Sequence, residues 1–121
     1  MVNVLKKSFW VLILAMLFSI NAEARNYYGA ISYSPSTGAY GYAYDYNSKS
    51  SARNAARRQC GYRSCKNSLW FRNACGALAV GNSGYGTGWG STKSRAKREA
   101  LRSCRKYSRG CYVKQWVCTT R

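Results

Sequence analysis

The sequence predicts an α+β fold, with one disulfide-stapled domain built from two β-β-α-β repeats. Three observations support this prediction. The same order of strand, turn, strand, helix and strand patterns occurs at about 28–71 and again at 75–118. Each helical segment has a narrow apolar stripe, mainly of alanine, that would pack on a sheet. Six cysteines follow the N-terminal apolar segment. We therefore expect about six mostly antiparallel strands with two helices on the sheet.

Residues 1–24 have the pattern of a cleaved signal peptide. Lys6 and Lys7 precede an apolar run at 8–20, and Ala22-Glu23-Ala24 has the small-x-small spacing of a cleavage site. The run is shorter than the ~20 residues that span a membrane, and we expect no transmembrane segment in the mature chain. Cleavage after Ala24 would leave one domain, residues 25–121, in the periplasm or outside the cell. A retained N-terminal anchor is the alternative.

The two repeats match in four blocks. In each half a short strand pattern and a turn lead to a second strand that contains aromatic residues. A helix follows, with polar capping candidates at Asn47 or Ser48 and at Ser91 or Thr92. No linker rich in proline or glycine separates the halves, so we expect one fused domain. The matching blocks are 29–33 with 76–80, 40–44 with 85–89, 48–60 with 92–104, and 69–71 with 115–117.

The cysteines predict three disulfides. An even number of cysteines in a small exported domain is typical of a disulfide framework, in which each bond is worth ~2–4 kcal/mol. A zinc site is the alternative, but the sequence has no histidine and no C-x-x-C pair. Repeat symmetry suggests a local pair after each helix and a third bond between the first and last strands of the second repeat: Cys60–Cys65, Cys104–Cys111 and Cys75–Cys118.

The charge of the chain is strongly positive. The whole sequence has 20 lysines and arginines and 3 acidic residues, of which Lys6, Lys7 and Glu23 lie in the predicted signal peptide. The remaining domain has 18 basic and 2 acidic side chains, a formal charge of +16. Such a domain attracts polyanions and acidic proteins. The alternative is a general bias towards basic composition with no specific partner.

The residue types argue against an enzyme, and they predict no cofactor and no metal site. Without histidine, mechanisms that need an imidazole base or ligand are excluded. Asp45 and Glu99 lie on different predicted elements, whereas paired-carboxylate chemistry needs two acids beside one substrate. We expect Asp45 to help cap the first helix and Glu99 to pair with Arg95 and Arg102. The glycine-rich run at 81–93 lacks the residue order of a phosphate loop, and its glycines fit close packing of a helix on a strand.

The second predicted helix offers a candidate surface for an anionic partner. Its basic residues share a stripe opposite Ala96 and Ala100, and two further cations extend towards the loop before Cys111. Guanidinium groups suit carboxylate and phosphate ligands. A solvated helix surface is the alternative. The candidate residues are Arg95, Arg98, Arg102, Arg105, Lys106 and Arg109.

Tyrosines at every second position of 40–46 suggest a candidate aromatic surface. In a strand these rings lie on one face, and Gly41 and Ala43 lie on the other. If the helix covers the small residues, the rings are free to stack on sugars or bases. If the helix covers the rings, they are part of the core. A domain of this size has a small core that needs large side chains, so we expect most of the rings to be buried. The candidate residues are Tyr40, Tyr42, Tyr44 and Trp89.

Four blocks of the sequence carry a resemblance to a known family. GAISYSPSTGAYGYAY, WFRNACGALAVG, GWGSTKSRA and CYVKQWVC fall in order along the chain. On these blocks the sequence resembles the exported bacterial family called domain of unknown function 4189, from about Tyr28 to Cys118. The resemblance implies a Cys-rich exported domain. It implies no established reaction and no catalytic residue.

Together these features predict a small exported binding module without catalysis. We expect it to engage an acidic protein, as an inhibitor or immunity-type protein would, or an anionic envelope polymer. The alternative is a cationic effector that binds envelope polyanions or, without sequence specificity, nucleic acid.

Overall fold

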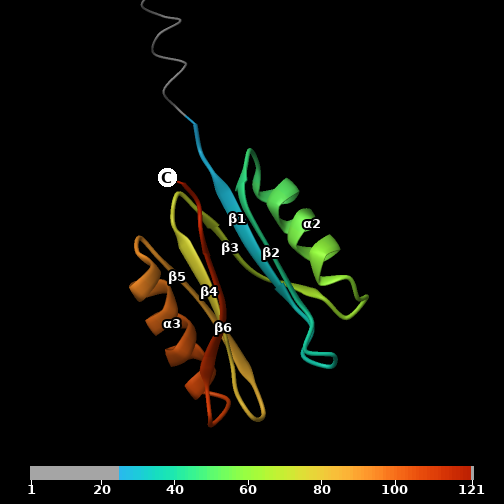
Figure 1. The fold of residues 1–121 in the computed structure, drawn as a ribbon, viewed down its shortest axis with the longest axis vertical. Helices are drawn as coiled ribbons and strands as arrows, with labels where there is room; N and C mark the ends of the chain where they lie inside the picture. The colour runs from blue at the N-terminus through green and yellow to red at the C-terminus, as the bar shows by residue number, and fades with distance from the viewer. Residues whose placement is uncertain (1–24, 121) are drawn as a thin grey trace, which may run out of the picture.

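Eight elements follow one another along residues 25–120, the part of the chain that the computed structural model describes. They form two successive copies of strand, strand, helix and strand (Figure 1), so the predicted repeats are confirmed. The predicted signal peptide, residues 1–24, lies outside the described residues. The elements are β1 (Tyr28–Tyr33), β2 (Tyr40–Tyr46), α2 (Lys49–Cys60), β3 (Lys66–Arg72), β4 (Cys75–Val80), β5 (Tyr85–Gly90), α3 (Lys93–Arg105) and β6 (Tyr112–Cys118).

Each repeat forms its own three-stranded antiparallel sheet. The strand orders are β2-β1-β3 and β5-β4-β6, so the first strand of each repeat is the central one. The predicted α+β class, with six antiparallel strands and two helices, is therefore confirmed. The division of the six strands into two separate sheets is a further property, which strand patterns alone do not specify.

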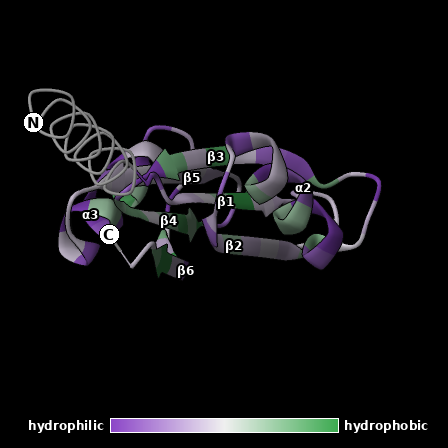
Figure 2. Cartoon of the chain, turned by 90° about the horizontal axis from the view of Figure 1, so that it is seen from above, coloured by the Kyte–Doolittle hydropathy of each residue, from purple (hydrophilic) through white to green (hydrophobic). Residues whose placement is uncertain are grey.

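The two sheets pack face to face, and each helix covers the outer face of its own sheet (Figures 1 and 2). Between the sheets, Ile31 of β1 and Leu78 of β4 are completely buried in one apolar cluster with Phe71. On the outer faces, alanines of the strands meet Ala52 and Ala56 of α2 or the equivalent residues of α3. The molecule thus has four layers, with bulky residues in the centre and small residues beneath the helices.

The two helices lie very close to their sheets. Gly41 of β2 packs against the backbone of α2, where an added Cβ would collide with the carbonyl oxygen of Ala56. Gly86 of β5 is in the same position under α3, against the backbone N of Cys104. The predicted role of the glycines in helix packing is therefore borne out by their contacts.

Three disulfides join Cys60 to Cys65, Cys104 to Cys111 and Cys75 to Cys118. These are the pairs suggested by repeat symmetry, and no cysteine within residues 25–120 is free. Two of the bonds connect a helix end to the segment before the next strand, and the third links β4 to β6. Because such bonds persist only where thiols are oxidised, the domain belongs to a compartment outside the cytoplasm.

Ser48→Ala is expected to lower the free energy of unfolding by about 1 kcal/mol. Ser48 is the N-cap of α2, where its hydroxyl oxygen accepts a hydrogen bond from the backbone N–H of Ser51 at 3.1 Å. Thr92 caps α3 in the same way through Arg95, so Thr92→Ala should behave alike. Urea denaturation measures both values. The exposed Ser50 provides the control, and a loss in Ser50→Ala as large as in Ser48→Ala would contradict the capping explanation.

Candidate functional site

A groove of about 600 Å³ lies between α3 and β5. One wall is formed by β5 and the turn that follows it, and the other by one side of α3. The narrow approach of strand and helix depends on Gly88, where an added Cβ would meet the Cβ of Glu99 at 2.5 Å. The residues whose side chains give the groove its character are Ser91, Arg95, Glu99, Arg102 and Lys106.

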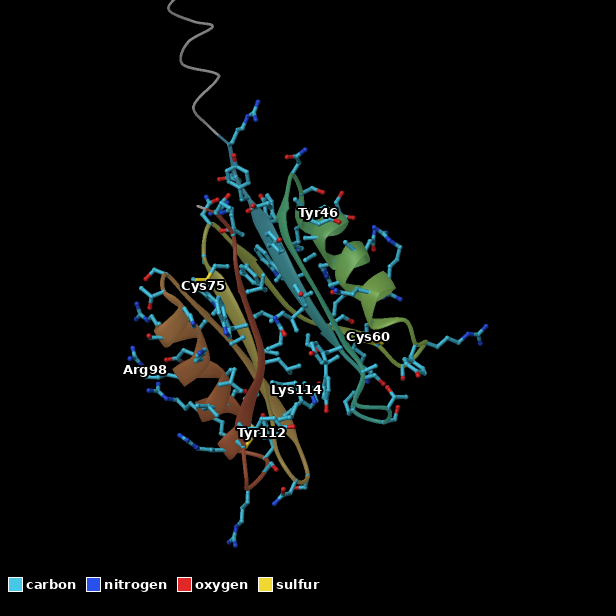
Figure 3. The ribbon with its side chains drawn as sticks, viewed as in Figure 1. Tyr46, Cys60, Cys75, Arg98, Tyr112 and Lys114 are labelled. Atoms are coloured by element: carbon cyan, nitrogen blue, oxygen red, sulfur yellow. A yellow bond between two sulfur atoms is a disulfide. The ribbon has the colours of Figure 1, made fainter. Side chains whose placement is uncertain are left out.

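Only part of the predicted basic surface lines this α3–β5 groove. Arg95, Arg102 and Lys106 do so, whereas Arg98 points away from the sheets into solvent (Figure 3). Residues 98 and 105 are rotated by roughly 60–80° from residue 95 around the helix axis. The six candidates are all exposed, but the structure divides them between the groove and the outer side of α3 and its following loop.

Trp89 borders the groove at the end of β5, but its ring lies on the face of β5 opposite to Gly88 and Gly90, towards β3. Its side chain is 60% exposed at the end of β5. Beside it, the aliphatic stem of Arg95 packs on Gly90, where an added Cβ would lie 2.7 Å from Cγ of Arg95. This contact positions the stem of Arg95 against β5, at one end of the groove. The groove is therefore bounded by positive charge along one side of α3 and by the glycine face of β5.

The two acidic residues are both engaged by neighbours. The carboxylate of Glu99 lies 3.6 Å from the guanidinium of Arg102, which is the only ion pair within residues 25–120. We expected Asp45 to help cap α2, but the N-cap of this helix is Ser48. Instead, the carboxylate of Asp45 accepts a hydrogen bond from the backbone N–H of Thr120 at 2.8 Å. Neither acid is paired with a second carboxylate.

The predicted aromatic surface does not exist as one patch. Tyr40 and Tyr42 pack against the central cluster between the sheets, so the rings meet the second sheet while α2 covers the glycine side. Tyr44 is 51% exposed. It belongs to β2, at the opposite open side of the sandwich from Trp89 on β5 (Figure 2). Core packing and sheet pairing thus separate the four residues.

A β-bulge ends the row of tyrosines. Tyr28 pairs with Tyr46 and Ala30 with Ala43, so β2 contains one more residue than β1 at this point. Asp45 takes a positive φ of 60° there. An extra residue moves the next side chain to the other face of a strand. Tyr46 consequently packs beside α2, apart from Tyr40 and Tyr42.

Two exposed tryptophans were not among the candidates. Trp70 on β3 is 44% exposed and Trp116 on β6 is 39% exposed. A lysine ammonium lies over each ring, Lys49 at 4.6 Å from the centre of Trp70 and Lys93 at 4.0 Å from that of Trp116. The sequence could have indicated these two residues, because each of the matching blocks at 69–71 and 115–117 has a tryptophan at its centre.

The described residues offer no metal cluster and no membrane span. Within residues 25–120, acidic and cysteine side chains form no group of three or more that could hold a metal ion. In the same range, no helix has the length and apolar character needed to cross a membrane.

Comparison with known proteins places the chain in a family. The model of the family described as Domain of unknown function (DUF4189) matches residues 28–118. The chain belongs to this family. The match covers both repeats of the DUF4189 domain, from the start of β1 to the end of β6.

Two proteins of Mycobacterium tuberculosis (strain ATCC 25618 / H37Rv) are similar to this DUF4189 protein. Protein Rv1269c is 37% identical over 97 residues, which cover 80% of this chain and 73% of the relative. Protein Rv1813c is 35% identical over 92 residues, which cover 76% of this chain and 60% of the relative. The NMR structure of Rv1813c aligns with a TM-score of 0.60 at 34% identity, over 76% of this chain and 74% of that chain. These similarities establish the family and the fold.

Proposed function

We propose that this DUF4189 protein is a periplasmic or secreted binding module without catalytic activity, which holds an acidic partner through the α3–β5 groove. The observation that carries the proposal is the lining of that groove. Three cations line it together with a single carboxylate. The pattern at residues 1–24 and the three disulfides support export.

The charge balance of the groove favours a ligand with carboxylate or phosphate groups. Glu99 can neutralise only one cation, and its ion pair is with Arg102. Arg95 and Lys106 therefore leave net positive charge in the groove. Hydrogen bonds between such groups and an anion are stronger than those between neutral groups. An acidic protein segment would satisfy these cations, as in an inhibitor or immunity-type protein that covers an acidic cleft.

A second candidate function rests on the distribution of charge over the whole domain. Exposed basic residues occur on α2 and in the loops as well as on α3, for example Arg58, Arg63 and Arg109. A cationic effector that binds envelope polyanions would use all of them without one defined site. Its binding would fall steeply with salt.

Affinity capture at two salt concentrations separates these functions. The disulfide-bonded protein, immobilised after export, is exposed to envelope and secreted extracts at low salt and at high salt. An acidic partner bound in the groove should remain at high salt, in an amount nearly equal to that of the immobilised protein. Capture of many anionic components at low salt, with complete loss at high salt, would contradict the proposal and favour the cationic effector.

Arg102→Glu is expected to weaken binding of the retained partner by about tenfold or more, because it places a second carboxylate beside Glu99 that competes with the partner for Arg95 and Lys106, and a charge-assisted hydrogen bond is worth roughly 1.5–3 kcal/mol. Arg58→Glu is the matched control. Arg58 occupies the equivalent position on α2, is exposed, and gives the same change of net charge. Calorimetric titration of both variants measures the effect. An equal loss of affinity in both would show that net charge, and not the groove, determines binding.

A further inference from the structure

The sandwich has two open sides, because no strand joins one sheet to the other. At one side β2 faces β6, and at the other β3 faces β5 (Figure 2). A cleft lies at each side. The β2–β6 cleft has a volume of about 620 Å³ and is lined by Tyr44, Lys97, Lys114 and Trp116 among others. The β3–β5 cleft has a volume of about 530 Å³ and is lined by Trp70, Arg72 and Trp89 among others.

The two clefts have the same construction in the two repeats. Tyr44 on β2 and Trp89 on β5 occupy matching positions, and so do Trp70 on β3 and Trp116 on β6. All four rings are more than one third exposed, although burial of such large apolar surfaces stabilises a small domain. Trp70 and Trp116 are each covered by a lysine of a helix, but no such contact accounts for the exposed Tyr44 and Trp89. Tyr44 and Trp89 face the opposite sheet, whereas Trp70 and Trp116 lie on the helix side of β3 and β6, at the outer edge of each cleft.

Cations accompany the rings in both clefts. In the β2–β6 cleft, the ammonium of Lys97 lies 5.5 Å from the centre of the Trp116 ring, and that of Lys114 lies 5.8 Å from the centre of the Tyr40 ring. In the β3–β5 cleft, the exposed Arg72 is the cation among the lining residues. An aromatic face beside a cation suits a ring-shaped ligand that carries an acidic group.

Strand addition does not explain the clefts, although β3 and β6 are edge strands. The pairing of β4 with β6 shifts between Leu78 and Ala79, which leaves Lys114 without a partner residue on β4. The pairing of β1 with β3 shifts at the equivalent place, beside Ser68. Bulges and lysines on edge strands discourage the addition of another strand. A ligand that contacts β3 or β6 therefore uses their side chains.

We propose that each cleft binds one segment of an acidic polysaccharide, so that the protein bridges two polysaccharide chains. Sugar rings stack on Tyr44 in one cleft and on Trp89 in the other, and their carboxylate or phosphate groups meet the lysines and arginine. Location outside the cytoplasm gives the domain access to such polymers. The two open sides face away from each other, which allows two polymer chains to bind at once. This inference goes beyond the proposed function, because it does not use the cations of the α3–β5 groove.

Calorimetric titration with a short oligogalacturonate, together with turbidity of polygalacturonate solutions, tests the inference on the disulfide-bonded protein. Two oligomers should bind per chain, and the polymer should be cross-linked. Tyr44→Ala and Trp89→Ala each remove one cleft, so each variant should bind one oligomer and lose cross-linking. The double variant should bind none. Tyr62→Ala, which removes an exposed ring outside both clefts, should leave two sites.

Other outcomes would overturn the inference. These are failure of the oligomer to bind, a stoichiometry of one in the unaltered protein, equal binding of a neutral galactose oligomer, or tighter binding of single-stranded DNA at the same residues. Lys114→Ala, which removes no ring from the fold, should weaken one of the two sites and so guards against misfolding of the aromatic variants. Arg102→Glu should keep both oligomer sites. Its effect on the acidic partner therefore tests the proposed function separately.

Discussion

Replacing Cys75 and Cys118 together by alanine is expected to lower the free energy of unfolding by about 4 kcal/mol. This bond spans 43 residues of sequence, the longest of the three disulfides. In the folded protein the two residues are already opposite each other in the pairing of β4 with β6. The bond therefore acts mainly by restricting the unfolded chain. Since small domains have a total stability of about 5–15 kcal/mol, much of the folding free energy depends on it.

The local disulfide Cys60–Cys65 provides the control for this prediction. It spans only 5 residues, so its replacement by two alanines should cost about 2 kcal/mol. Urea denaturation followed by tryptophan fluorescence gives both values. Because each variant loses one largely buried disulfide, the difference between them isolates the length of the closed loop. Equal losses, or a greater loss from the local pair, would contradict the entropic explanation.

The repeat could be predicted from the sequence because it consists of local patterns. Strand alternation, helix stripes and capping residues each depend on neighbours along the chain. The layering depends on which face meets which element. In β2 one face carries Tyr40 and Tyr42 and the other carries Gly41 and Ala43, so a bulky face and a small face both need cover. In the structure the bulky face meets the other sheet and the small face meets α2.

The candidate sites could be predicted only as sets of residue types. The cations of α3 follow from the sequence, but their division depends on where β5 lies beside the helix. Arg95 and Arg102 meet β5 across the groove, whereas Arg98 does not line it. The predicted alternation of tyrosines along 40–46 is interrupted by a bulge at Asp45. The sequence gives no sign of this bulge, because the residue with the positive φ is not a glycine and no glycine or proline lies beside it. Long-range pairing of β1 with β2 fixes that bulge.

Gly41→Ala is expected to lower the free energy of unfolding by about 3 kcal/mol, because it inserts a methyl group where β2 and α2 are in close contact. The new Cβ would meet the carbonyl oxygen of Ala56 and would lie 2.5 Å from the backbone N of Cys60. Backbone atoms cannot rotate away as the end of a flexible side chain can, so the whole helix must move. That movement separates Ala52 and Ala56 from the alanines of the sheet. Gly86→Ala should have a similar effect under α3, where the added Cβ would meet the backbone of Ser103 and Cys104.

Gly38→Ala separates this steric effect from the general cost of replacing glycine. Gly38 has a positive φ of 78°, but an added Cβ there would have no atom within 4 Å. Its replacement should therefore cost only the backbone strain, about 1 kcal/mol. Thermal and urea denaturation of the three variants provide the comparison. If Gly41→Ala were no more destabilising than Gly38→Ala, the contact between β2 and α2 would be able to yield, and close packing would not be the reason for glycine at position 41.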